Sequence, residues 1–315
     1  MVELSNLRVF LAAAEELNFS RAAKRLRMSQ SAVSQNIQVI ERSYGMDLFI
    51  RHGRSIELSE AGKSILPMVR EVLLAARVLE DGLQDFNNQI GGELFIGCST
   101  SAGKYLLPIL LSEFQRIYPS VQPRVNVMNR ELVIERLISR IIPLGVASRL
   151  IEHRDIESMP FFEDRIILIV PPEHAWAKQG HVQLSDITDQ PLINCDKTFG
   201  TYETVMQGLK RHKITIDHLN VVMELGSMEA VEMSVERGVG VAFVSEMVAA
   251  RGLALGLIKK VEVDELDLRR KIYMARHVGF PFTRAQSLFW EYTKSQYDKI
   301  NSEIWESLVN FEPTA

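Results

Sequence analysis

At 315 residues the chain is long enough for two or three compact units, each able to bury a core. Its 36 Lys and Arg and 40 Asp and Glu give a net charge of −4, which argues against indiscriminate binding to nucleic acid. Apolar runs are too short to span a membrane, and the start Met1-Val2-Glu3-Leu4 lacks the pattern of a secretory signal. We therefore expect a cytoplasmic protein with no membrane partner.

Charge is unevenly distributed along the chain. Residues 1–58 hold eight Lys and Arg against six Asp and Glu, a net charge of +2, which leaves −6 for the remainder. The two cysteines, Cys98 and Cys195, lie far apart, and the seven histidines are scattered without metal-ligand spacing. This usage fits a reducing compartment, and we expect no metal and no cofactor.

The first 27 residues predict two helices. Leu4, Leu7, Phe10, Leu11, Ala14 and Leu17 recur at helical spacing and indicate one core-facing stripe. Phe19 precedes Ser20 in the manner of a hydrophobic staple before an N-cap. A short helix over 21–27, with Ala22, Ala23 and Leu26 inward, would follow, and Met28-Ser29 would end it. Its length is typical of the first helix of a helix-turn-helix.

A third helix is predicted from Ser29, which is a good N-cap residue. Val33, Ile37, Ile40 and Tyr44 fall on one face, which we expect to pack against the core. Polar side chains on another face suit hydrogen bonding to base edges in a major groove. The alternative for any single one of them is a merely solvated helix face. The candidate base-reading residues are Gln30, Ser31, Ser34, Gln35 and Gln38.

A hairpin is predicted next, over residues 48–58, with a turn at His52-Gly53. Arg51 and Arg54 would contact DNA backbone beside the groove, and Arg21 and Lys24 are placed to contact phosphates. Ser20 is a further DNA-binding candidate. Together the three helices and the hairpin outline a winged helix-turn-helix. Double-stranded DNA is therefore the first expected partner.

These residues carry a close resemblance to a known family. Residues 18–23 (Asn-Phe-Ser-Arg-Ala-Ala), Ser29-Gln30, Val33-Ser34, Leu48-Phe49 and residues 58–62 (Leu-Ser-Glu-Ala-Gly) resemble the N-terminal signature of LysR-type transcriptional regulators. The match continues to about Tyr292. The resemblance implies a DNA-binding regulator, dimeric or tetrameric, whose C-terminal half senses a small molecule.

Residues 59–88 predict a long helix with a heptad seam. The seam residues step by four and three, and such a pattern favours pairing with the same helix of a second protomer. The alternative is a helix that packs on its own body, and Pro67 is expected to bend it. The seam consists of Ile65, Val69, Val72, Ala76, Leu79, Leu83 and Phe86. We expect a homodimer or homotetramer formed through this linker helix.

Beyond residue 90 strand and helix signals alternate, as in parallel α/β units. The candidate strands cover residues 93–97, 125–127, 144–147, 166–170, 192–194, 221–223 and 239–244. The family resemblance implies two α/β subdomains like those of a periplasmic binding protein, with the chain crossing near Phe161-Phe162 and returning near Leu266 to Arg270. After this return, a helix is expected over residues 281–296.

The expected organisation is an α/β multidomain chain. It comprises a winged helix-turn-helix domain (1–58), a linker dimerisation helix and hinge (59–90), effector subdomain I (91–162 plus 269–296), effector subdomain II (163–268) and a C-terminal tail (297–315).

Ligands of open α/β sheets bind where strands end and helix N-termini converge. Loops with hydroxyl groups follow strands at Ser99-Thr100-Ser101 and at Thr198 to Thr201, and the family resemblance matches both to the effector cleft. The alternative role for each is ordinary helix capping. The candidate effector residues are Ser99, Thr100, Ser101, Asn129, Arg149, Thr198 and Thr201.

Residues 99–108 resemble regulators of carbon fixation or sulfur assimilation, which implies an anionic metabolite as effector. Cys98, beside this loop, is either a redox-sensitive thiol or a buried small residue. Two other functional classes are a solute-binding protein and an enzyme built on the α/β half. The first would need export, and the second would need a nucleophile and base for which no motif appears, so we expect no enzyme.

Overall fold

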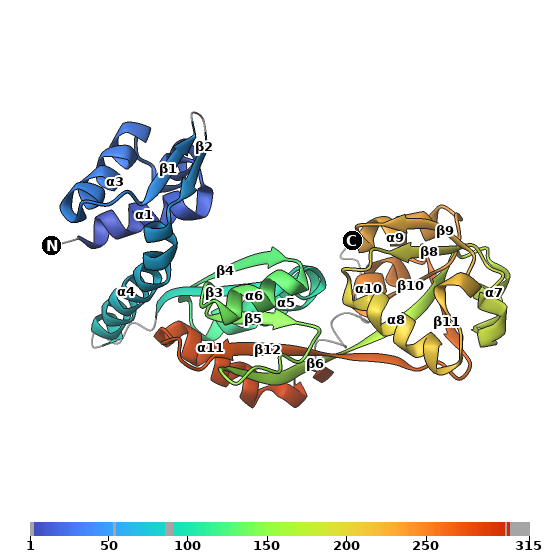
Figure 1. Cartoon of the computed structure of the whole chain (residues 1–315). Helices are drawn as coiled ribbons and strands as arrows, with labels where there is room; N and C mark the ends of the chain where they lie inside the picture. The colour runs from blue at the N-terminus through green and yellow to red at the C-terminus, as the bar shows by residue number, and fades with distance from the viewer. Residues whose placement is uncertain (1–2, 53–54, 86–90, 300, 303–315) are drawn as a thin grey trace. The chain divides into compact units, whose positions relative to one another are not determined.

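The computed structural model describes residues 3–52, 55–85, 91–299 and 301–302, without the side chains of residues 81, 84 and 85. The chain divides into two compact units, residues 1–89 and 90–315, which we call unit 1 and unit 2. Figure 1 shows unit 1 in blue and the mixed sheets of unit 2 in green to red. Among the described residues, every helix is too short or too polar to cross a lipid bilayer.

Unit 1 begins with three helices, α1 (Leu4–Glu16), α2 (Phe19–Leu26) and α3 (Gln30–Tyr44). Each ends at a residue in the left-handed conformation, and the third of these is Gly45 with φ of 66°. The Ser29 side chain accepts the N–H of Ala32, so the predicted cap of α3 is confirmed. Val33 and Ile37 are fully buried, which confirms the packing face of that helix.

Some sequence predictions for unit 1 are wrong. Helix α2 begins at Phe19 instead of Arg21, because Asn18, and not Ser20, caps it by accepting the N–H of Arg21 at 3.0 Å. Phe19 then lies inside the first turn and packs edge-on against Phe49. Leu4, Leu17 and Tyr44 are 40, 45 and 55% exposed, since each lies at or beside a helix end where the core no longer covers it.

The predicted hairpin is confirmed as β1 (Phe49–His52) paired antiparallel with β2 (Ser55–Leu58). Its position relative to α3 is set by Glu41, whose carboxylate accepts the backbone N–H groups of Leu48 and Phe49. The predicted turn residue Gly53 and the candidate Arg54 lie outside the described residues.

Helix α4 (Glu60–Asp85) follows, with Pro67 inside it and the Ser59 hydroxyl accepting the N–H of Gly62. The seam residues are buried near the start of the helix and exposed farther along. Val69 is buried in the core of unit 1, so the alternative of packing on its own body holds there. Farther along, Val72, Leu79 and Leu83 are 47, 64 and 60% exposed, and Phe86 lies outside the described residues.

Unit 2 has the predicted α/β organisation, and its main sheet is mixed, with antiparallel strands beside the parallel ones. Strand β3 (Gly91–Ser99) pairs parallel with β4 (Ser120–Met128) and β5 (Leu144–Ala147). The long strands β6 (Ile156–Val170) and β12 (Leu268–His277) run antiparallel to each other, because one carries the chain out and the other returns it. Figure 1 shows these two strands crossing the unit side by side, near the residues expected for the crossings.

The far part of β6 pairs antiparallel with β10 (Ala242–Ser245) and β11 (Lys259–Val263). Strand β11 and its parallel neighbour β7 (His181–Val182) were not predicted. Strands β8 (Leu192–Cys195) and β9 (Val221–Leu225) form a separate parallel pair. The helices of unit 2 are α5 (Leu107–Ile117), α6 (Arg130–Ile138), α7 (Ala175–Gln179), α8 (Gly200–Arg211), α9 (Met228–Glu236), α10 (Glu246–Ala254) and α11 (Arg284–Ser295), with a π-helical turn η1 (Ala102–Leu106) and 3-10 turns η2 (Leu184–Ile187) and η3 (Ile216–His218).

The apolar cores of unit 2 follow the two crossings. One pair of clusters draws on residues 94–162 and 272–290, and the other on residues 166–268. Met247 is an exception that packs in the first pair, and Tyr105 contacts both. The boundary between the two cores is therefore formed by segments that are distant in the sequence.

Candidate functional site

The candidate base-reading side chains lie on α3. Gln30, Ser31 and Gln35 are exposed, and Ser34 and Gln38 are half-buried. The Ser31 hydroxyl lies 2.9 Å from that of Ser29, and the Gln38 side chain accepts a hydrogen bond from Arg42. The N-terminal half of the helix therefore offers uncharged donors and acceptors to solvent, the groups that match base edges.

The candidate phosphate-contacting side chains lie on α2 and on the hairpin. Ser20, Arg21 and Arg51 are exposed. The Arg21 guanidinium donates to the backbone oxygen of Glu16 at 2.6 Å, so it is held at the end of α1. The Arg51 guanidinium stands over the ring of Phe19, 5.5 Å from its centre. These contacts orient two cations at the surface of unit 1.

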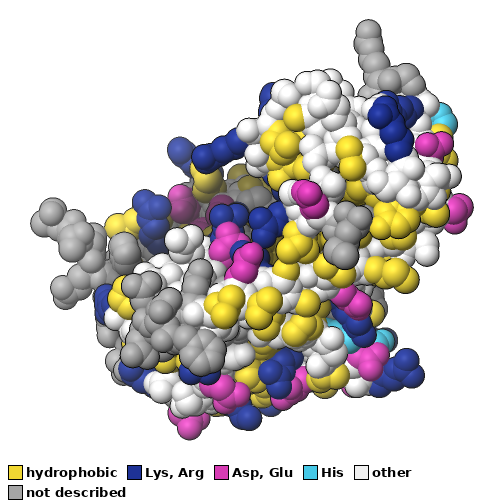
Figure 2. Space-filling view, turned by 90° about the vertical axis from the view of Figure 1, so that its left-hand side faces the viewer, with side chains coloured by type: hydrophobic (Ala, Val, Ile, Leu, Met, Phe, Trp, Pro, Cys, Tyr) yellow, Lys and Arg dark blue, Asp and Glu magenta, His cyan; other side chains and the backbone are white. Residues whose placement is uncertain are grey.

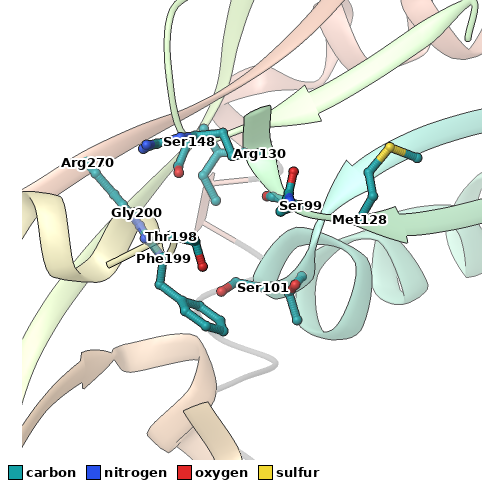
Figure 3. A pocket seen from close by; sticks show the side chains of 12 residues that line it. Ser99, Ser101, Met128, Arg130, Ser148, Thr198, Phe199, Gly200 and Arg270 are labelled. Atoms are coloured by element: carbon teal, nitrogen blue, oxygen red, sulfur yellow. The ribbon is translucent and has the colours of Figure 1, made fainter. Parts of the chain in front are cut away.

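A cleft in unit 2 gathers five of the seven candidate effector residues. Its walls include Ser99, Thr100, Ser101, Asn129 and Thr198, and its free volume is about 40 Å³. Figure 3 shows Ser99 and Ser101 on one side of the cleft and Thr198, Phe199 and Gly200 on the other. Sequence reasoning missed the remaining lining residues, which are Met128, Arg130, Ser148, Phe199, Gly200, Arg270 and Ile272.

Helix N-termini meet at this cleft. Asn129 caps α6 by accepting the N–H of Leu132 at 2.8 Å. Helix α8 starts at Gly200 after Phe199, whose side chain has no acceptor with which to cap it. The N-terminus of a helix carries partial positive charge, so this edge of the cleft favours an anion. The Thr198 hydroxyl donates to Asp196 at 2.6 Å, which holds the preceding loop in place.

A buried ion pair stands behind the cleft wall. Asp164 on β6 is fully buried, and its carboxylate accepts from Arg270 Nε on β12 and from the Ser245 hydroxyl, both at 2.8 Å. Burial raises the pKa of Asp164, and the adjacent Arg270 opposes that rise. Arg270 Nη2 lies 2.7 Å from the same carboxylate oxygen but, among the described residues, makes no hydrogen bond. The ion pair holds the Arg270 guanidinium against Asp164, while the Arg270 residue lines the cleft.

Thr201 was predicted to line the cleft, and this is wrong. It is 1% exposed, and its hydroxyl accepts a hydrogen bond from Arg270 Nη1 at 3.2 Å. Thr198 lies in the loop before α8, whereas Thr201 lies in the first turn of that helix, within the wall, where its hydroxyl supports the Arg270 side chain.

Arg149 is also outside the cleft. It lines a neighbouring pocket of about 280 Å³ and lies 3.5 Å from the carboxylate of Glu203 on α8. The same carboxylate contacts Arg130 through its other oxygen. Arg130 is 7% exposed and does line the cleft. The cation that the sequence suggested at Arg149 is thus supplied to the cleft by Arg130.

Cys98 lies at the end of β3 and is fully buried. Burial raises the pKa of its thiol to about 12, so it is protonated near neutral pH. Reactive thiols need a lowered pKa and access to solvent. The geometry therefore favours the alternative of a buried small residue.

Comparison with known proteins gives the class of this chain. Residues 4–63 match the model described as "Bacterial regulatory helix-turn-helix protein, lysR family", and residues 87–298 match the model described as "LysR substrate binding domain". With the winged helix-turn-helix of unit 1 and the cleft of unit 2, these matches mean that the chain belongs to the LysR family of DNA-binding transcriptional regulators.

Similar curated proteins span nearly the whole chain. An uncharacterized HTH-type transcriptional regulator of Methanocaldococcus jannaschii is 31% identical over 297 residues, covering 92% of this chain and 98% of that protein. A probable RuBisCO transcriptional regulator of Cyanidioschyzon merolae is 32% identical over 273 residues, covering 86% and 90%.

Solved structures share the fold. A full-length OxyR variant from Pseudomonas aeruginosa has a TM-score of 0.68 at 20% identity, covering 94% of this chain and 98% of that one. CbnR complexed with its target DNA has a TM-score of 0.66 at 22% identity, covering 93% and 99%. The regulatory domain of Synechocystis CcmR in complex with 2-PG has a TM-score of 0.60 at 25% identity, covering 67% and 99%.

Proposed function

We propose that this regulator senses a small anionic metabolite in the cleft of unit 2 and alters its binding to promoter DNA in response. The observation that carries the proposal is the convergence of Arg130, Arg270 and the N-termini of α6 and α8 on one small cleft. Guanidinium groups and unpaired helix N–H groups are the donors with which proteins bind phosphate and carboxylate.

Both arginines are held rigidly enough to act as binding groups. Arg270 is oriented by Asp164 and Thr201, and Arg130 by Glu131 and Glu203. Their side chains are 7 and 8% exposed. Because little water screens these charges, an anion would gain more from them than from surface lysines. Hydroxyl groups of Ser99, Thr100 and Ser101 would complete its hydrogen bonds.

The similar proteins agree with this chemistry. Relatives at about 30% identity are named probable RuBisCO transcriptional regulators, and the CcmR domain was solved with 2-PG. We infer an effector of the same general kind for this chain, a small metabolite bearing negative charge, and a role in transcription with no catalytic turnover.

We further propose how the parts divide the work. Residues 1–58 would contact DNA, with α3 reading bases and with Arg21, Arg51 and Arg54 on phosphates. Residues 59–90 would pair two protomers, and the segments 91–162 plus 269–296 and 163–268 would form the two subdomains that close on the effector. Closure on a ligand changes the relative position of two subdomains, and that shift would reach the DNA through the paired helices.

The test of the effector site is a thermal-shift titration of the full chain with 2-PG. Wild-type protein should show a rise in Tm that grows with 2-PG concentration, since a ligand that binds the folded state stabilises it by mass action. Arg130→Gln removes a buried cation from the cleft wall and should abolish the rise. Thr100→Val should reduce it and leave DNA binding unchanged.

Arg154→Gln is the matched control, because Arg154 is on the same unit but its side chain is 90% exposed and is not part of the cleft lining. It should titrate like the wild type. An equal rise in Arg130→Gln and the wild type would place the anion elsewhere and refute the site.

A further inference from the structure

The cleft is smaller than the ligand it is proposed to hold. About 40 Å³ of free volume accommodates only a few water molecules, since one water occupies roughly 10–15 Å³ by this measure. The neighbouring pocket, with about 280 Å³, shares Ser148, Gly200 and Arg270 with the cleft. The two spaces are therefore adjacent, and some contact between them limits the cleft.

That contact is the ion pair of Arg130 with Glu203. Arg130 lines the cleft, Glu203 lines the neighbouring pocket, and their side chains meet between the two. Arg130 begins α6, on the side of the cleft formed before the first crossing, whereas Glu203 lies in the first turn of α8, on the opposite side. The ion pair thus joins the two walls across the space that a ligand would enter.

Glu203 presents a carboxylate to Arg130, as an anionic ligand would. Its carboxylate occupies one nitrogen of a guanidinium that is 8% exposed, and it is itself only 32% exposed. The other carboxylate on Arg130 is different in kind. Glu131 is the next residue of the same helix and is 53% exposed, so its contact with Arg130 lies within α6 and does not cross the cleft.

We propose that Glu203 is an internal competitor of the effector, which must displace the Glu203 carboxylate from Arg130 in order to bind. The proposal rests on the proposed effector site. Displacement leaves Glu203 with a partner, because its other oxygen already lies 3.5 Å from Arg149. Anion binding then exchanges one contact of Arg130 for another. Glu203 thereby lowers the affinity of the cleft for any anion that binds Arg130.

The experiment compares Glu203→Gln with Glu131→Gln in the full chain, using isothermal titration calorimetry with 2-PG and with inorganic phosphate. Each variant removes one negative charge beside Arg130, but only the first removes the contact across the cleft. Glu203→Gln should bind either anion about tenfold more tightly than Glu131→Gln does, since a charge-assisted hydrogen bond no longer has to be broken. Glu203→Asp, whose shorter side chain weakens the contact, should give a smaller gain in the same direction.

Binding to Glu203→Gln that is equal to or weaker than binding to Glu131→Gln would overturn the proposal, because Glu203 would then only support the fold of the cleft. Arg130→Gln separates the two hypotheses. If the wild type binds 2-PG and Arg130→Gln does not, the effector site stands whatever Glu203 does. If neither the wild type nor Glu203→Gln binds either anion, the anionic effector site is wrong and the competitor role is wrong with it.

Discussion

The residues that matter most to the cleft are charged groups placed where charge is costly. Asp164 is 0% exposed and its partner Arg270 is 9% exposed. Burying either ion alone is strongly unfavourable, and together they persist because Ser245 and Thr201 satisfy part of their hydrogen-bonding capacity. The pair holds Arg270 at the cleft wall.

Asp164→Asn should destabilise unit 2 by about 3–5 kcal/mol, because it leaves a buried guanidinium without a counter-charge. The measurement is urea unfolding of the full chain followed by the fluorescence of Trp176 and Trp290, both buried in unit 2.

Asp267→Asn serves as the control for this prediction. Asp267 also pairs with an arginine of β12, Arg269, but its side chain is 72% exposed, so its loss should change stability by less than about 0.5 kcal/mol. Similar unfolding midpoints for the two variants would show that the buried pair contributes no more than the exposed one.

Among the elements, helix α3 has the clearest division of faces. Val33, Ile37 and Ile40 are buried, while Ser31 and Gln35 remain at the surface. Glu41 links the C-terminal part of α3 to the hairpin through two backbone N–H groups. These hydrogen bonds hold the hairpin of unit 1 in a defined position relative to α3.

The double change Ser34→Ala and Gln35→Ala should reduce affinity for a duplex selected by the wild type from random sequences. It should also reduce the ratio between the affinity for that duplex and the affinity for a scrambled duplex. A specific side-chain contact to a base contributes about 1–3 kcal/mol, so a loss of roughly tenfold or more is expected. Fluorescence anisotropy at fixed salt concentration measures both quantities.

Ser43→Ala is the control on the same helix. Ser43 is exposed near the C-terminal end of α3 and donates only to the backbone oxygen of Val39, so DNA binding should be unchanged. If affinity and preference also survive in the double variant, α3 is not the reading element.

At the scale of the whole molecule, the main feature is an apolar stripe on α4 that is not buried in the core of unit 1. Val72, Leu79 and Leu83 continue the seam whose first residues pack in the core of unit 1. Figure 2 shows one face of the molecule, on which hydrophobic side chains lie at the surface among charged ones. Apolar a and d positions of a heptad helix are stabilised by a second helix, which supports pairing of two protomers.

The double change Leu79→Asp and Leu83→Asp should convert an oligomer into monomers at micromolar concentration, because pairing would bring four carboxylates into an apolar seam. Sedimentation velocity of the full chain measures the change in mass. Ser64→Asp, at an exposed position of α4 outside the seam, should leave the oligomer intact. A wild-type protein that sediments as a monomer would contradict the prediction at once.

Local patterns were enough to predict several elements. The Ser29 cap, the buried face of α3 and the hairpin of β1 and β2 follow from residues within one turn or one strand of each other. The boundary of α2 was missed because two possible caps, Asn18 and Ser20, lie two residues apart. Local rules do not say which of these two residues caps the helix. The packing of Phe19 against Phe49 of the hairpin agrees with a cap at Asn18.

The cleft shows a similar division. Loops with hydroxyl groups after strands identified Ser99, Thr100, Ser101 and Thr198 as candidates, since strand ends and helix starts are visible in the sequence. Arg130 and Arg270 were not found. Nothing near them in the chain marks them, because their partners Glu203 and Asp164 are 73 and 106 residues away.

By itself, the sequence determined the family, the winged helix-turn-helix and the alternation of strands and helices, because these depend on the periodicity and capping of neighbouring residues. Only the tertiary structure decided which polar side chains face the cleft. Antiparallel pairing of β6 with β12 brings Asp164 beside Arg270, and the position of α8 across the cleft from α6 brings Glu203 to Arg130. Such contacts arise from the register of distant segments, which no local pattern encodes.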